Sequence, residues 1–165
     1  MPMYEGSGAV MTYKYRSIYS LACLCFLALF IDGAQAQNRV TFPADFDQMV
    51  MYGDYRRGSG GEQAYALQET IDIARAGQPL PPGTRLVLEI YNNNALTDYF
   101  VMEKGEGWGL DFSEEQRTSD WHFQQYDPDR QVRRTSIAER CQSCHQGAAS
   151  NDFMFTIDRM RAYLP

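Results

Sequence analysis

The sequence predicts an α+β fold: an antiparallel β-sheet flanked by helices, with a C-terminal helix that carries a Cys-x-x-Cys-His motif. Residues 85–91 and 99–104 have the alternating pattern of strands and are joined by a short turn, as in an antiparallel sheet. Residues 43–53 and 68–76 have the apolar spacing of helices. The motif occupies residues 141–145, where a last helix is expected.

The first 36 residues have the three parts of a secretory signal peptide. Lys14 and Arg16 precede an apolar run over residues 18–31, and the small residues Ala34 and Ala36 follow it. We therefore expect a signal peptide over residues 1–36, cleavage near Ala36, and a periplasmic or secreted domain over the rest of the chain, residues 37–165. An uncleaved membrane anchor is the alternative, although the run is short for a bilayer span.

Two helices are expected in the first half of this domain. Residues 43–53 begin with a proline, repeat apolar residues at helical spacing and end in Gly53. Residues 68–76 form the second helix, which Gly77 ends. A short strand is expected between them, over residues 64–66.

The sheet is expected to follow. Leu86, Leu88 and Ile90 alternate along residues 85–91, so they should share one face of that strand. Asn92 begins a turn of three asparagines. The remaining strands are expected over residues 99–104, 108–112 and 121–126, and the last helix from residue 136.

The charge and the cysteine content reduce the number of functions that the sequence can support. The formal net charge of −6 and the acidic isoelectric point of about 4.9 disfavour a nucleic-acid partner. Cleavage of the leader would remove Cys23 and Cys25 from the four cysteines of the chain. The two that remain, Cys141 and Cys144, both lie in the motif beside His145.

The spacing of Cys141, Cys144 and His145 is that of a c-type haem attachment motif. Each thiol can add to one vinyl group of a haem, and the adjacent imidazole can ligate the iron. In an exported chain with no other cysteine, this favours one covalent haem c. Three other interpretations stay open: a disulfide, a thioredoxin-like redox pair, and a zinc site with His122 as the fourth ligand.

The position of the motif predicts a five-coordinate iron. Met154 and Met160 follow His145 too closely to fold over the far face of a haem. Met102 lies in an apolar pattern typical of core residues, and His122 is expected to be an ordinary strand residue, although it is a candidate sixth ligand. An open face on the iron binds or activates a small molecule.

Six segments occur in a recognisable order: GQPLPPGT (77–84), VLEIY (87–91), VMEK (101–104), WHF (121–123), CQSCHQ (141–146) and DFMFT (152–156). In these segments the chain resembles the cytochrome P460 family, which includes the β-sheet cytochromes c′ (cytochrome c′-beta). The resemblance covers nearly all of residues 37–165. It implies an antiparallel sheet flanked by helices, often a homodimer, and one haem c held by Cys141, Cys144 and the proximal His145.

The resemblance also implies a distal residue. Members that oxidise hydroxylamine carry a lysine cross-linked to the haem, at the position of Leu88 in this chain. The only lysine after the leader is Lys104, one strand later. Relatives without the cross-link bind diatomic gases, chiefly nitric oxide, behind an apolar cap, and Leu88 would belong to that distal wall.

Three functions follow as hypotheses. The first is an exported cytochrome that binds a small gas such as nitric oxide at a five-coordinate iron. The second is a haem oxidoreductase acting on hydroxylamine, nitric oxide or peroxide. The third is periplasmic electron transfer to a partner protein. Whether the chain is an enzyme is left open; the oxidoreductase would need a distal acid or base, for which the candidates by residue type are Arg85, Glu89, Glu103 and Asp111.

Overall fold

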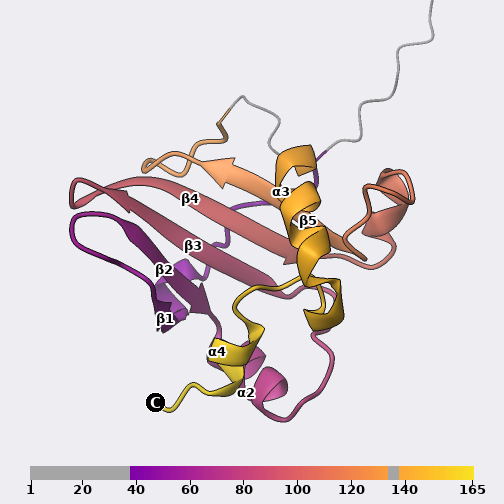
Figure 1. Cartoon of the computed structure of the whole chain (residues 1–165), viewed down its shortest axis with the longest axis horizontal. Coiled ribbons are helices and arrows are strands. Elements are labelled where there is room, and N and C mark those ends of the chain that lie inside the picture. Colours follow the sequence, from indigo (N-terminus) through magenta and orange to yellow (C-terminus); the bar gives the residue numbers. More distant parts are fainter. Residues whose placement is uncertain (1–37, 134–137) are drawn as a thin grey trace, which may run out of the picture. The chain divides into compact units, whose positions relative to one another are not determined.

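The computed structural model describes residues 38–133 and 138–165, and the predicted leader lies outside them. Within the described residues, one antiparallel sheet has its five strands in sequence order (Figure 1). The strands are β1 (Val50–Asp54), β2 (Gly61–Ala66), β3 (Arg85–Asn92), β4 (Ala95–Lys104) and β5 (Trp121–Tyr126). Together with the helices they confirm the predicted α+β class.

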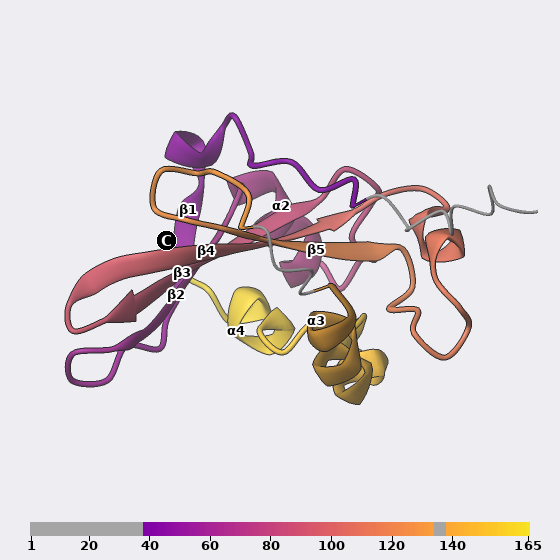
Figure 2. The ribbon, with the colours of Figure 1, turned by 90° about the horizontal axis from the view of Figure 1, so that it is seen from above.

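Three α-helices and three 3-10 helices accompany the sheet in residues 38–133 and 138–165. The α-helices are α2 (Gln68–Arg75), α3 (Ala138–His145) and α4 (Ile157–Arg161), and the 3-10 helices are η1 (Phe46–Gln48), η2 (Trp108–Asp111) and η3 (Gln146–Asn151). Both α3 and α4 lie on one side of the sheet, and η1 lies on the other (Figure 2). No helix in the described ranges is long and apolar enough to span a membrane.

The strand register gives each face of the sheet its own core. Leu86 pairs with Met102 and Met102 with Phe123, so these side chains share the face that α3 and α4 cover. Leu88, opposite Phe100, lies on the same face, as the alternation predicts. The other face carries a second cluster, which contains Val40, Val87, Tyr99, Val101 and Tyr126.

Several local predictions are confirmed. Helix α2 covers most of the range 68–76, and Gly77 follows it with φ of +69°. Asn93 and Asn94 form the two-residue loop between β3 and β4, with φ of 51° and 61°. Asparagine tolerates this left-handed conformation better than most residues, which suits a tight hairpin.

The helix predicted over residues 43–53 is wrong. Only η1 is helical, and the chain then extends into β1, where Val50 pairs with Ala66 of β2. The apolar spacing has another cause: Phe46 packs against the second cluster, whereas Tyr52 is buried in the first. Pairing with β2 therefore outweighs the local helical pattern.

The strand predicted over residues 108–112 is also wrong, because this segment forms η2. Gly107 begins it with φ of +71°, and Gly109 lies so close to the backbone of Ser119 that a Cβ atom would be 2.3 Å from its carbonyl oxygen. Leu110 is 76% exposed. The apolar residues in the range 108–112 thus belong to a compact helical turn and not to a paired strand.

Candidate functional site

A cavity of about 510 Å³ lies between the sheet and α3. Its size falls within the range of about 300–1,000 Å³ that is usual for small-molecule and cofactor sites. β1 to β5, α3 and the loop after η3 all contribute to its walls. The lining residues include Tyr52, Glu62, Leu86, Leu88, Phe100, Met102, Phe123, Gln125, Arg140, Cys141, Cys144, His145, Met154, Phe155 and Thr156.

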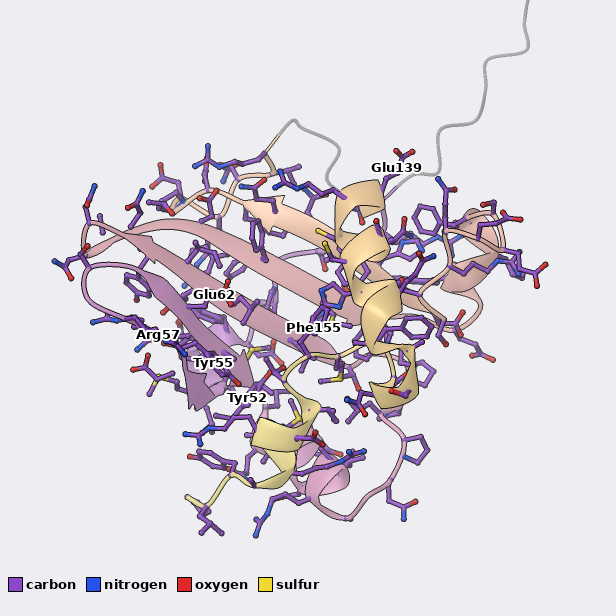
Figure 3. The ribbon with its side chains drawn as sticks, in the orientation of Figure 1. Tyr52, Tyr55, Arg57, Glu62, Glu139 and Phe155 are labelled. Carbon is purple, nitrogen blue, oxygen red and sulfur yellow. The ribbon has the colours of Figure 1, made fainter. Side chains whose placement is uncertain are left out.

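The sheet wall of this cavity is mainly apolar. Leu88 and Phe100 pair directly across β3 and β4, and Met102 and Phe123 continue the same face toward β5. Glu62, on β2, is the exposed carboxylate of the lining (Figure 3). A neutral ligand that lies against these apolar side chains therefore leaves none of their atoms without a hydrogen-bond partner.

Helix α3 forms the opposite wall and contains the whole motif. Cys141 and Cys144 are both free thiols, three positions apart and therefore neighbours on the helix surface, and both line the cavity. Burial raises the pKa of the Cys141 thiol to about 11, and the nearby Cys144 contributes in the same direction. Gln142 is buried, and its amide has no hydrogen-bond partner in the described part of the chain.

His145 is fixed by its surroundings. Its Nδ1 donates a hydrogen bond to the carbonyl oxygen of Phe153 at 2.5 Å, which leaves Nε2 with a free lone pair. The ring packs against Phe123 and Phe155, with centroid distances of 4.6 and 5.1 Å. Burial lowers the pKa of His145, and the bond to Phe153 opposes this only in part. The imidazole is thus held neutral and oriented, as an iron ligand must be.

Leu88 and Lys104 occupy different environments. Leu88 lines the cavity. Lys104 does not: its Nζ lies 2.8 Å from the Oδ2 atom of Asp152 and 5.3 Å from the centre of the Trp121 ring. The one lysine of residues 37–165 is therefore held in an ion pair and not in the cavity wall.

The structure does not bring His122 to the motif. His122 and Phe123 are consecutive in β5, so their side chains point to opposite faces of the sheet, and Phe123 is the one that contacts His145. The Nε2 atom of His122 donates to the carbonyl oxygen of Trp108 at 2.8 Å. This geometry disfavours His122 as a sixth iron ligand or as a zinc ligand with Cys141 and Cys144.

The four acid or base candidates taken from residue type also lie away from the cavity. Glu89 accepts hydrogen bonds from Tyr65 and Tyr91, Arg85 pairs with Glu103, and Asp111 pairs with Arg39. None of them lines the cavity. The register explains this, because Arg85, Glu89 and Glu103 alternate with cavity residues and face the other side of the sheet.

Sequence reasoning missed several lining residues. Phe100 alternates with Met102 along β4 and could have been found from the strand pattern. Tyr52 could not, because the apolar spacing of residues 43–53 predicts a helix there and not a strand. Its hydroxyl is 2.8 Å from the Thr156 hydroxyl. Phe155, which lies beside α3 in Figure 3, lines the cavity although it is 63% exposed, and its position depends on the fold of the chain after the motif.

Comparison with known proteins adds one finding. No curated protein gives a significant match to the chain. A family model described as Cytochrome P460 matches residues 43–156, which include all five strands, the cavity lining and the Cys-x-x-Cys-His motif. On this match, over more than half of its length, the chain belongs to the cytochrome P460 family.

Proposed function

We propose that this chain is an exported mono-haem c-type cytochrome that binds a small gaseous ligand, such as nitric oxide, at a five-coordinate iron. Family membership implies a haem cofactor. The cavity fits one: it has a wide apolar wall, two thiols on one helix and a neutral imidazole with a free Nε2. When bound, the haem supplies an iron with one open coordination position.

The residues of α3 would hold the cofactor. Cys141 and Cys144 would form the two thioether bonds, and His145 would ligate the iron through Nε2. The carbonyl of Phe153 keeps the proton on Nδ1 and thus selects the ligating tautomer. These assignments combine the motif spacing with the shared cavity wall.

The observation that carries the gas-binding proposal is the pair formed by Leu88 and Phe100 on the sheet wall. Both side chains are apolar, and Leu88 is at the position where the family resemblance predicts a cross-linking lysine in the members that oxidise hydroxylamine. Such a wall accepts a neutral diatomic ligand, whereas cleavage of peroxide requires a polar group that delivers a proton. Oxidation of hydroxylamine through a lysine cross-link has no lysine at Leu88 to support it.

A second candidate function rests on Met102. Its thioether lies on the sheet wall, across the cavity from α3, and methionine is a common sixth ligand in electron-transfer cytochromes. Against this, Met102 is buried between Leu86 and Phe123, as a core residue is. Ligation by Met102 would give a six-coordinate, low-spin iron and would favour electron transfer to a partner protein.

Optical and electron paramagnetic resonance spectra of the purified holoprotein distinguish these functions. We expect a high-spin ferrous iron that binds nitric oxide and carbon monoxide without turnover. A low-spin ferrous iron that binds neither gas would contradict the proposal. If Met102→Leu then converted that iron to high spin, the electron-transfer alternative would hold.

Export is part of the proposal and has its own test. Lys14 and Arg16 precede the apolar run of the leader. Fractionation of cells that express the full chain should find the holoprotein outside the cytoplasm, with an N-terminus near Gln37. Replacement of both basic residues by glutamate should reduce export, and an unchanged distribution would contradict a leader of this type.

A further inference from the structure

The loop after η3 has a backbone conformation that needs support. Asp152 and Phe153 have φ of 52° and 61°, in the left-handed region of the backbone that residues other than glycine rarely adopt. The carbonyl of Phe153 is the one that accepts the Nδ1 hydrogen bond of His145. Strained residues of this kind persist only where the surrounding structure holds them.

An ion pair holds this turn from the sheet. Lys104, the last residue of β4, places its Nζ 2.8 Å from the Oδ2 atom of Asp152. The lysine side chain is 13% exposed and lies over the ring of Trp121, which is fully buried. An ion pair shielded in this way is worth more than one in water, because solvent screens it less.

Backbone hydrogen bonds complete the support. The amide of Phe153 donates to the carbonyl of Ala148 at 3.0 Å, and the amide of Met154 donates to that of Asn151 at 3.1 Å. These bonds close the turn onto η3. The Lys104–Asp152 pair is the link from the turn to the end of β4, at the register where Lys104 faces Trp121.

We propose that Lys104 and Asp152 act as positioning residues for the proximal histidine, holding the Phe153 carbonyl against Nδ1 of His145. This inference rests on the proposed function, in which His145 ligates the iron. A hydrogen bond to Nδ1 makes the imidazole a stronger electron donor to a metal. The ion pair therefore sets the strength of the iron–histidine bond from a position outside the cavity.

The test uses the holoprotein and measures the iron–histidine stretching band of the ferrous form by resonance Raman, together with the reduction potential. Asp152→Asn and Lys104→Met should each lower the stretching frequency, because the carbonyl is no longer held against Nδ1. The reduction potential should rise, because a weaker donor stabilises ferric iron less. Lys104→Arg keeps the charge and should retain most of the wild-type frequency.

Glu103→Gln is the matched control. Glu103 is the neighbour of Lys104 in β4 and forms a comparably shielded pair with Arg85 at 2.9 Å, but on the opposite face of the sheet. Loss of the Glu103–Arg85 pair should leave the iron–histidine stretching frequency unchanged. The exchange Lys104→Asp with Asp152→Lys restores opposite charges and should recover the frequency in part, which guards against variants that are merely poorly folded.

The outcomes separate the two proposals. A wild-type protein without an iron–histidine band would overturn the proposed function and this inference with it. A wild-type band that neither Asp152→Asn nor Lys104→Met shifts more than Glu103→Gln does would overturn the inference alone. If neither single variant yields folded holoprotein, the charge exchange decides. A frequency restored in part or in full to the wild-type value supports the positioning role of the ion pair, and the frequency of an imidazole without an Nδ1 hydrogen bond contradicts it.

Discussion

Single side chains decide which chemistry this cavity can support. Leu88 presents a hydrocarbon surface to the cavity, whereas a lysine there could reach a bound cofactor. Lys104 has the amine that a cross-link to a cofactor would need, but this amine forms an ion pair with Asp152. The tautomer of His145 depends on its partner, since the Phe153 carbonyl accepts the hydrogen bond from Nδ1 and leaves Nε2 free.

A polar side chain at position 88 should change the stretching frequency of a gas that is bound beside it. Leu88→Gln introduces an amide donor to the apolar wall, and Leu88→Met keeps the wall apolar at similar volume. With carbon monoxide as the probe, the glutamine variant should lower the C–O stretching frequency, because an N–H donor polarises the bound gas. The methionine variant should match wild type. Equal frequencies in the two variants would show that Leu88 does not face the ligand.

Tyr126 should make stability fall in alkaline solution. Burial, with a contribution from Glu103, raises the pKa of this phenol to about 12 from an ordinary value of 10.0. Between these pH values the unfolded chain loses the phenolic proton and the folded chain keeps it, so the free energy of unfolding decreases as pH rises.

Urea unfolding of Tyr126→Phe tests this dependence. At neutral pH the variant should lose about 1 kcal/mol, because the Tyr126 hydroxyl donates to the carbonyl of Val40 at 2.9 Å. Above pH 10 the difference from wild type should shrink, because the variant has no phenol to ionise at this position. A difference that stays constant up to pH 12 would contradict the assignment.

Among the elements, strand pairing outweighs local pattern. Residues 43–53 have apolar residues at helical spacing, yet only η1 is helical, because four of the five residues of β1 pair with β2, on either side of an irregularity at Tyr52. Helix α2 forms as its own sequence predicts, since Ile71 and Ala74 give it one buried face. Local pattern is sufficient where the neighbouring elements agree with it.

Gly77 offers a test of how an element ends. Its φ is +69° and nothing lies within 4 Å of the position of a Cβ atom, so Gly77→Ala adds backbone strain without a clash. We expect a loss of about 1 kcal/mol in the free energy of unfolding. Gly147→Ala is the control, because that site is equally open and has no left-handed φ. Equal effects of the two substitutions would show that the end of α2 does not depend on glycine.

At the scale of the whole molecule, the cavity lies between two walls of the domain. The sheet forms one, and α3 with the loop after η3 forms the other. A bound haem would fill this space and add apolar contacts to both walls. Stability and cofactor binding should therefore be coupled.

Loss of covalent attachment tests that coupling. The double variant Cys141→Ala, Cys144→Ala should carry no haem after denaturation and should have a lower midpoint of thermal unfolding. Cys144→Ala alone keeps one thioether position and should retain covalent haem. Covalent haem in the double variant would contradict the assigned attachment site.

The sequence alone was sufficient for the α+β class, for α2 and for most of β3, β4 and β5, because these segments have strong periodicity and clear turn residues. It also predicted the family, which the family match confirms. It could not assign the acid and base candidates correctly. Glu89 and Glu103 are one position away from cavity residues, and a single step along a strand reverses the face of the sheet.

By itself, the sequence determined the haem-type motif, because the chemistry of Cys141, Cys144 and His145 depends only on spacing within a few residues. It also gave an apolar Leu88 at the position where the family resemblance predicts a lysine in the members that oxidise hydroxylamine. Only the tertiary structure decided which residues face that motif: Phe100 beside Leu88, and Lys104 against Asp152, 48 residues later. Such contacts depend on strand register and on the path of the chain after α3, and both follow from packing across the whole domain and not from any local pattern.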